Sequence, residues 1–146
     1  MRARILIGIS SLLLLCGACR AKEGDGLKSI KAMDNYKILM GLKDVGDEGS
    51  AGKLVIEIQA IKGWKFNKKA PVVIKLRSPG GIELAKQKLR KKDASTVGDK
   101  KCRFELGFKK SKEPDSPLEL KFDFVICTDT LCQKKRFTLS YTFPRG

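Results

Sequence analysis

Apolar and polar residues alternate with a period of two in five segments of the chain: 53–60, 71–77, 102–108, 118–126 and 136–143. In the fourth of these segments, Leu118, Leu120 and Phe122 share one face, while Glu119 and Lys121 share the other. This alternation is typical of β-strands that bury one face, and short strands separated by Gly-, Pro- and Lys-rich turns indicate an antiparallel sandwich. The pattern therefore predicts an all-β protein.

Three further segments have a weaker pattern. The apolar run 36–42 predicts a first strand at the edge of a sheet, and the Gly-rich segment 46–52 predicts a loop. The segment 82–92 follows two glycines and is dense in lysine, so we expect a strand and a loop there rather than a short helix. No alternation of strands and helices, and no Gly-rich phosphate loop, interrupts the β pattern.

The start of the chain has the pattern of an export signal. Arg2 and Arg4 precede a short apolar core, and the small pair Gly17 and Ala18 stands directly before Cys19. This boundary is similar to a bacterial lipobox, in which cleavage occurs before the cysteine and its sulfur receives a lipid. Ordinary secretion without a lipid is the alternative interpretation.

These features divide the chain into three parts. We expect residues 1–18 to be a lipoprotein-type signal peptide and residues 19–35 to contain the lipidated Cys19 and a short flexible tether. The remaining residues, 36–146, form the folded domain. The expected location is the bacterial cell envelope, where a lipid anchor holds the domain facing the periplasm or the cell exterior.

Composition narrows the possible chemistry. The 146 residues carry a net charge of +15 and include no histidine, which excludes Ser-His-Asp and Cys-His catalysis and His-ligated metals. Basic residues cluster at 86–92, 100–103, 109–112 and 134–136. Export argues against nucleic acid as a partner, so these clusters indicate a solvated face or attraction to anionic lipids or an acidic protein. We expect no cofactor.

The remaining candidate chemistry lies in a pair of cysteines between the last two predicted strands. Cys127 and Cys132 flank a Thr-Asp-Thr turn, so their Cα atoms are expected to lie within the roughly 4.4–6.8 Å of a disulfide. In an oxidising compartment such a bond persists. It would close a loop of about six residues and stabilise the fold by only about 2 kcal/mol. Thiol exchange and a purely structural bridge both stay open at this point.

The local charges favour Cys132 as the reactive thiol. Lys134 and Lys135 follow it closely, and cations stabilise a thiolate, whereas Asp129 lies near Cys127 and acts in the opposite sense. Cys132 would then attack a partner's disulfide, and Cys127 would resolve the mixed disulfide. The two lysines and the aspartate are the expected modulators of thiol ionisation.

A third cysteine, Cys102, shares a strand face with Phe104 and Leu106, which predicts a buried core thiol. A metal site formed by Cys102, Cys127 and Cys132 is a third hypothesis. The expected burial of Cys102 and the lack of histidine stand against it, so no metal is expected.

Two segments resemble a known family. Residues 61–67, Ile-Lys-Gly-Trp-Lys-Phe-Asn, are similar to the Gly-Trp-His-Ile-Asn element of the N-terminal domain of the thiol–disulfide interchange protein DsbD, a family also called disulfide bond corrector. Residues 127–132, Cys-Thr-Asp-Thr-Leu-Cys, resemble its Gln-Ala-Cys-(Asn/Asp)-Asp-x-x-Cys element. The order of elements also matches over residues 37–143. Residues 91–98 align with the loop that shields the family's active site, and they contain no aromatic residue.

The resemblance implies an immunoglobulin-like sandwich with a redox-active cysteine pair, in which Cys132 attacks and Cys127 is its partner. It implies protein-disulfide reductase or thiol–disulfide interchange activity. Such domains take electrons from a membrane-embedded donor and pass them to thioredoxin-like or other envelope thiol proteins. Trp64 is expected to be a packing and turn residue. The alternative is a non-catalytic immunoglobulin-like binding lipoprotein with a structural disulfide and a basic face for a partner or membrane.

Overall fold

The computed structural model describes residues 26–145, which form eleven β-strands and two short 3-10 helices. The strands are β1 (Lys28–Ala32), β2 (Tyr36–Lys43), β3 (Ala51–Ala60), β4 (Lys65–Phe66), β5 (Val73–Arg77), β6 (Ile82–Leu84), β7 (Lys88–Arg90), β8 (Thr96–Val97), β9 (Lys101–Lys110), β10 (Leu118–Cys127) and β11 (Cys132–Tyr141). The helices are η1 (Asp47–Gly49) and η2 (Lys91–Asp93). The signal sequence 1–18 and the lipid at Cys19 fall outside the described residues.

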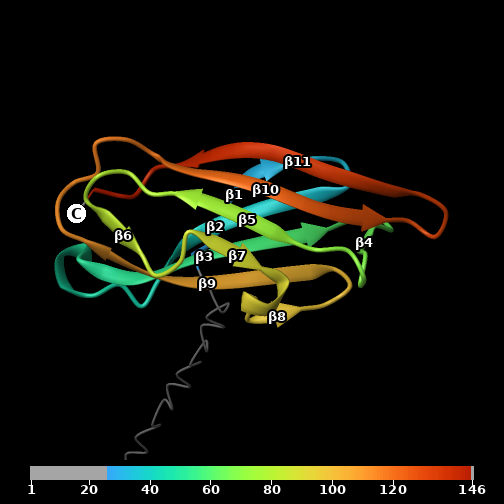
Figure 1. The fold of residues 1–146 in the computed structure, drawn as a ribbon, viewed down its shortest axis with the longest axis horizontal. Coiled ribbons are helices and arrows are strands. Elements are labelled where there is room, and N and C mark those ends of the chain that lie inside the picture. The colour runs from blue at the N-terminus through green and yellow to red at the C-terminus, as the bar shows by residue number, and fades with distance from the viewer. Residues whose placement is uncertain (1–25, 146) are drawn as a thin grey trace, which may run out of the picture.

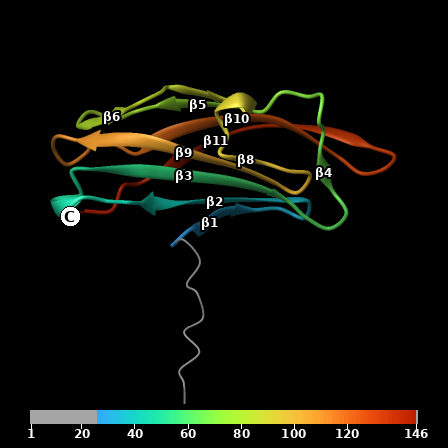
Figure 2. The same ribbon diagram turned by 90° about the horizontal axis from the view of Figure 1, so that it is seen from below.

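Two antiparallel sheets form the molecule (Figures 1 and 2). One sheet has the strand order β1-β2-β3-β9-β6, and β8 also pairs with β9; the other has the order β11-β10-β5-β7, and β4 also pairs with β10. Figure 2 shows β5 and β10 in a layer above β2 and β3. The predicted all-β antiparallel sandwich is confirmed, and its architecture is immunoglobulin-like. Within residues 26–145, no helix has the length and apolar character needed to cross a bilayer.

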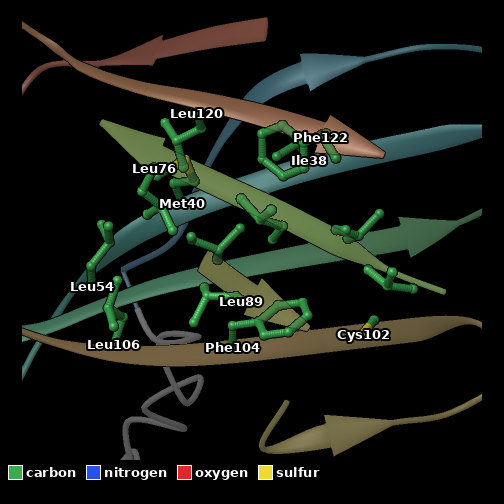
Figure 3. Close-up of a cluster of buried hydrophobic side chains, with 14 of the residues drawn as sticks. Ile38, Met40, Leu54, Leu76, Leu89, Cys102, Phe104, Leu106, Leu120 and Phe122 are labelled. Carbon is green, nitrogen blue, oxygen red and sulfur yellow. The ribbon is translucent and has the colours of Figure 1, made fainter. Parts of the chain in front are cut away.

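The hydrophobic core lies between the sheets and follows from the alternation in sequence (Figure 3). Each long strand turns every second side chain inward, so Phe122 and Phe124 of β10 and Phe104 of β9 are fully buried. Each such side chain stabilises the fold by about 1.5–3 kcal/mol through removal from water. Among the described residues, the buried cluster runs from Tyr36 to Phe143.

The sandwich begins earlier than the sequence pattern indicates. Residues 28–32, which the pattern places in the flexible tether, form β1 and pair with β2; Lys31 Nζ lies 4.9 Å from the centre of the Phe137 ring. A register shift between Ser29 and Lys31 interrupts this strand, so it has no regular alternation to detect. Because β1 occupies the edge, the strand predicted there at 36–42 is an interior strand.

The segment 82–92 contains two short strands that belong to different sheets. β6 pairs with β9, whereas β7 pairs with β5, so the chain crosses from one layer to the other between them. Gly81 precedes β6 with a φ of 93°, and a Cβ there would lie 2.7 Å from the carbonyl oxygen of Lys112, which leaves room only for glycine. The expected strand is present, but the expected loop contains β7 and η2. The loop expected at 46–52 likewise contains η1 and the start of β3.

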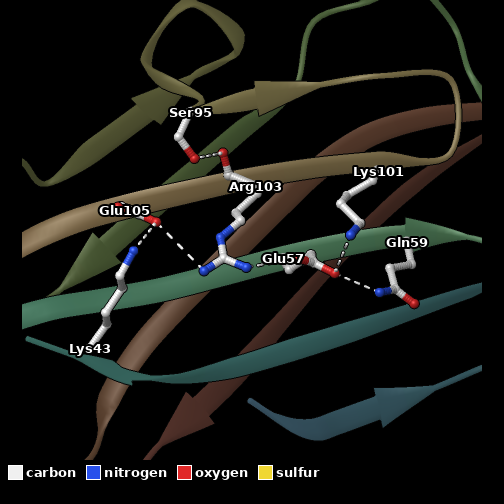
Figure 4. Close-up of polar contacts among 7 residues, drawn as sticks. All are labelled: Lys43, Glu57, Gln59, Ser95, Lys101, Arg103 and Glu105. Atoms are coloured by element: carbon white, nitrogen blue, oxygen red, sulfur yellow. Dashed lines mark hydrogen bonds and ion pairs between the residues drawn. The ribbon is translucent and has the colours of Figure 1, made fainter. Parts of the chain in front are cut away.

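A buried carboxylate joins β3 to β9 on the outer face of their sheet (Figure 4). Glu57 is 3% exposed; it accepts a hydrogen bond from Gln59 and pairs with Lys101 at 3.6 Å and Arg103 at 3.4 Å. Arg103 also lies 3.5 Å from Glu105. Because removing one partner from such a cluster leaves an uncompensated buried charge, the cluster fixes how the two strands pair.

Candidate functional site

β10 and β11 form a hairpin that brings Cys127 and Cys132 together. The strands are in register along ten residue pairs, from Leu118 opposite Tyr141 to Cys127 opposite Cys132. The two cysteines form a disulfide, and their Cα atoms lie 4.0 Å apart. This distance is shorter than expected from the sequence, because residues directly opposite on neighbouring strands approach more closely than most bridged pairs. The predicted bridge and hairpin are present.

Four residues close the hairpin. The N–H of Thr128 donates to the carbonyl oxygen of Leu131 at 2.7 Å, and the N–H of Leu131 donates to Thr128 Oγ1 at 3.1 Å. Asp129 and Thr130 lie exposed at the tip. A threonine hydroxyl therefore satisfies the backbone of the turn, as the turn residues in the sequence predict.

The disulfide lies on the outer face of its sheet. Phe124 and Ile126 of β10 point into the core, so Cys127 points outward with Val125. Cys127 is half-buried and Cys132 is exposed. The hairpin turn projects beyond the neighbouring strands, at the right of Figures 1 and 2. A partner protein can therefore reach Cys132 without opening the sandwich.

A tight turn lies before β4. The N–H of Trp64 donates to the carbonyl oxygen of Ile61 at 3.1 Å, and the two residues between them, Lys62 and Gly63, have φ values of 53° and 83°. Positive φ at both central positions favours glycine and strains lysine. Trp64 packs partly buried against the core, which confirms its expected role as a packing and turn residue.

This turn places β4 beside the cysteine hairpin. β4 pairs with the end of β10, so that Lys65 stands directly opposite Cys127. Asn67 follows β4, and its Nδ2 lies 3.7 Å from Cys127 Sγ. The two segments that resemble the DsbD family are thus neighbours in the fold. The sequence pattern did not assign Lys65 or Asn67 to the site, because their contact with Cys127 depends on the pairing of strands that are distant in the chain.

Lys134 lies on the same face of β11 as Cys132, two residues further along. Its Nζ is 3.6 Å from Asp123, which also receives a hydrogen bond of 2.8 Å from Arg136 Nη2. Burial raises the pKa of Asp123, but the hydrogen bonds and charges of Arg136 and Lys134 outweigh it and hold that pKa below its ordinary value. The charge of Lys134 is therefore shared with a carboxylate.

Lys135 points to the opposite face from the disulfide. It donates to Gln133 Oε1 at 2.7 Å, and its Nζ lies 5.5 Å from the centre of the Tyr36 ring. Asp129 stands at the exposed tip of the turn. Of the three expected modulators of the thiols, the structure therefore places Lys134 on the face of the disulfide, Asp129 at the hairpin tip and Lys135 behind the strand.

Cys102 lies in the core on β9, opposite Ile58 of β3 (Figure 3). It is 1% exposed and forms no disulfide. Burial raises the pKa of its thiol to about 11, although the charge of Lys91 acts in the opposite direction. The predicted core thiol is confirmed. Across residues 26–145, no group of three or more Cys, Asp or Glu side chains is arranged to hold a metal ion.

Residues 91–98 form η2 and β8 and support the loop that follows β4. Lys91 Nζ donates to three backbone carbonyl oxygens, those of Asn67 at 3.3 Å, Lys68 at 2.8 Å and Ala70 at 3.4 Å. β8 pairs with β9, and Val97 within it is exposed. This segment therefore fixes the loop that carries Asn67.

Comparisons with known proteins give structural neighbours only. No family model and no curated protein matches the chain. Solved structures that align with it include the GAE domain of GGA2p from Saccharomyces cerevisiae, with 12% identity over 82% of this chain and 99% of that chain and a TM-score of 0.47. The N-terminal periplasmic domain of ScsB from Proteus mirabilis aligns with 17% identity over 80% of this chain and 50% of that chain, with a TM-score of 0.40.

The N-terminal domain of DsbD from Neisseria meningitidis, in its reduced form, aligns with 12% identity over 73% of this chain and 86% of that chain. Its TM-score is 0.29. Because these identities and scores are low, the function of this chain has to be argued from the geometry of its own site.

Proposed function

We propose that the protein carries out thiol–disulfide exchange through Cys127 and Cys132. The observation that carries this proposal is a disulfide on the outer face of a projecting hairpin, with one sulfur-bearing residue exposed. The ten-pair register of β10 and β11 already holds the hairpin, and a bridge across about six residues adds only about 2 kcal/mol. An accessible bond that contributes little to the fold is suited to chemistry with a partner.

The exchange proceeds in two steps. A thiolate of the partner attacks Cys132 Sγ, and the electron pair of the broken S–S bond leaves with Cys127 Sγ. The partner's second thiolate then attacks the mixed disulfide and releases Cys132 as a thiolate. The partner is oxidised to a disulfide, and the cysteine pair is reduced to a dithiol. In the other direction, Cys132 attacks a partner's disulfide and Cys127 resolves the intermediate.

The proposed setting is the bacterial cell envelope. Support comes from the export pattern of residues 1–18 and the lipobox-like residues before Cys19, which together predict a lipid-anchored domain outside the cytoplasm. Partners of matching chemistry are thioredoxin-like or other envelope thiol proteins, and the proposed electron donor is a membrane-embedded protein. The oxidising environment there keeps the disulfide formed until a partner reduces it.

The reduction potential of the Cys127–Cys132 bond tests the proposal. Residues 20–146 contain all the strands and the buried cluster that the structure describes, so this fragment is equilibrated with glutathione or thioredoxin buffers, and free thiols are counted by alkylation and mass spectrometry. We expect a potential between about −150 and −280 mV, the range of exchange-active disulfides. Cys127→Ser should trap partners as mixed disulfides on Cys132. A potential below about −300 mV, typical of structural bridges, would overturn the proposal.

One observation favours a second function, the binding of an anionic partner. Lys88, Lys75 and Lys121 stand opposite one another on the neighbouring strands β7, β5 and β10. They line a shallow hollow of about 370 Å³ together with Asp123 and Arg136. Like charges opposite one another are unfavourable in an isolated sheet, so an acidic protein or anionic lipid headgroups would relieve their repulsion. Lys75→Glu should weaken binding to anionic vesicles and leave the reduction potential unchanged.

A further inference from the structure

The two sulfurs of the disulfide have different surroundings. Asn67 Nδ2 donates a hydrogen bond to Cys127 Sγ at 3.7 Å, and Lys65 stands opposite Cys127 on β4. In the part of the chain from 26 to 145, no side chain donates a hydrogen bond to Cys132 Sγ. A donor binds an ionised acceptor about twice as strongly as a neutral one. The hydrogen bond from Asn67 therefore favours negative charge on Cys127, whereas Lys134, the cation on the face of Cys132, is paired with Asp123.

The Asn67 amide is held in place from several sides. Its backbone N–H donates to the carbonyl oxygen of Val125 at 3.2 Å, which ties it to the strand that carries Cys127. Its Oδ1 accepts hydrogen bonds from the N–H groups of Lys69 at 2.9 Å and Ala70 at 3.2 Å. Because Oδ1 is occupied by the loop, Nδ2 is the atom that faces the sulfur.

Lys91 secures the same loop from outside through its three bonds to backbone carbonyl oxygens. The donor beside Cys127 Sγ therefore occupies its position before any reaction begins. A preorganised donor of this kind stabilises developing charge without the cost of reorienting during the reaction.

We propose that Asn67 is a catalytic residue that assigns the roles of the two sulfurs, by stabilising Cys127 as the leaving thiolate when a partner attacks Cys132. This inference rests on the exchange function proposed above. In the step concerned, a bond forms between the partner's sulfur and Cys132 Sγ while the Cys127–Cys132 bond breaks. Its electron pair goes to Cys127 Sγ, where the Asn67 N–H meets the new charge, and no proton has to move. Attack on Cys127 instead would place the charge on Cys132, away from this donor.

The variant Asn67→Asp removes the donor with little change in shape. It keeps Oδ1 for the N–H groups of the loop and places a carboxylate oxygen where Nδ2 meets the sulfur. Asn35→Asp is the matched control, because Asn35 Nδ2 donates to Gln133 Oε1 at 3.0 Å, beside Cys132 but not on a sulfur. Asn67→Ser is a second variant, in which a hydroxyl supports the turn but is too short to reach Cys127 Sγ.

The rate of disulfide reduction by dithiothreitol at neutral pH is the first measurement, made on oxidised protein of residues 20–146. Because exchange slows when the leaving thiol is less acidic, we expect Asn67→Asp to be reduced about tenfold more slowly, Asn67→Ser about threefold more slowly and Asn35→Asp less than about twofold more slowly. The second measurement locates the first attack by mapping the glutathione adduct by mass spectrometry. The adduct should lie on Cys132 in the unchanged chain and be shared between both cysteines in Asn67→Asp.

A third measurement reports the charge directly. With Cys132→Ser as background, Asn67→Asp should shift the half-maximal alkylation of Cys127 to a pH about one unit higher. Equal reduction rates and equal adduct positions in the folded Asn67 variants and the unchanged chain would overturn the inference, and so would an equal slowing in Asn35→Asp. Failure of the exchange function has a different signature, since the unchanged chain would then itself resist reduction.

Discussion

Burial decides what each thiol of the sandwich can do. Cys102 lies on β9 among the apolar side chains of the core, and burial raises its pKa to about 11, so the sulfur stays protonated well into the alkaline range. Cys132 is exposed at the end of a projecting hairpin, and its partner Cys127 receives a side-chain hydrogen bond. The same functional group therefore serves as packing in one strand and as a candidate reaction centre in another.

Cys102 should make the stability of the fold depend on pH in the alkaline range. The pKa of its thiol is 9.0 in the unfolded chain and about 11 in the sandwich. Above pH 9 the unfolded state therefore binds fewer protons than the folded state, and stability falls as pH rises. Below pH 9 the thiol is protonated in both states, so its ionisation takes no stability away. As the pH rises from about 8.5 to about 10.5, the free energy of unfolding should fall by about 1–2 kcal/mol less in Cys102→Ala than in the unchanged chain. Urea unfolding at several pH values measures both.

Two tyrosines, Tyr36 and Tyr141, also make stability depend on pH in alkaline solution, and the comparison of the two proteins removes their effect. Burial raises the pKa values of Tyr36 and Tyr141, so both also lower stability as they begin to ionise in the unfolded chain. They are present in both proteins and cancel in the difference. An equal alkaline loss in Cys102→Ala and the unchanged chain would contradict the assignment to Cys102.

At the scale of elements, a strand of two residues depends on the turn before it. β4 contains only Lys65 and Phe66, yet it places the residues that face Cys127. The preceding turn holds Lys62 at a φ of 53°, which a side chain with a Cβ adopts at a cost. The local geometry of this turn is thus linked to the geometry of the disulfide site.

Replacing the strained lysine should stabilise the turn. Asparagine tolerates the left-handed region better than lysine, so Lys62→Asn should raise the free energy of unfolding by about 0.5 kcal/mol, whereas Gly63→Ala should lower it by about 1 kcal/mol. Lys69→Asn is the control, because Lys69 is exposed in a loop without positive φ. Urea unfolding at neutral pH measures all three. A gain in the control equal to that of Lys62→Asn would contradict the explanation.

Strands β9 and β10 could be predicted from sequence because each alternates over ten residues with one face buried. The alternation of β3 is less regular, since Val55 and Glu57 on its outer face are buried as well. Four of the short strands could not be predicted. β1 contains a register shift, and β4, β7 and β8 have two or three residues each, so their strand character comes from a neighbour in space rather than from their own pattern.

Part of the candidate site could likewise be predicted from the sequence, and part of it could not. The cysteine hairpin is local, so the spacing of Cys127 and Cys132 was sufficient to predict it. The orientation of Lys135 also follows from strand alternation, because residues 132 and 135 lie on opposite faces of a strand. The prediction that both lysines act on the thiol took account of their distance along the chain but not of these faces. Asn67 lies 60 positions from Cys127 and meets it only when β4 pairs with β10, which no local pattern reports.

At the scale of the whole molecule, the excess of positive charge acts against the folded state. The chain carries a net charge of +15, and part of it is concentrated where Lys75 stands between Lys88 and Lys121 on adjacent strands. Repulsion among exposed like charges is reduced by salt. We call Lys88, Lys75 and Lys121 the lysine row. Salt should change the stability of the fold more through repulsion in this row than through its isolated surface ion pairs.

Reversing the central charge of the row tests this expectation. Lys75→Glu should raise the free energy of unfolding by about 0.5–1 kcal/mol at low ionic strength, because two repulsive cross-strand pairs become attractive. Lys37→Glu is the matched control, since Lys37 is exposed on β2 opposite Ala32 and Gln59, which are neutral. Unfolding in low and high salt is the measurement. A gain that does not shrink in high salt would contradict an electrostatic origin.

The early start of β1 limits how far the candidate site can stand from a membrane. Gly26 and Leu27 already lie against Gly41 of β2, so both residues belong to the folded body. If Cys19 carries the proposed lipid, the seven residues from Arg20 to Gly26 span at most about 25 Å when fully extended. The start of β1 then lies within about that distance of the bilayer, and the reach of Cys132 is limited to this length plus the extent of the folded body. Distance from the membrane would select redox partners alongside their chemistry.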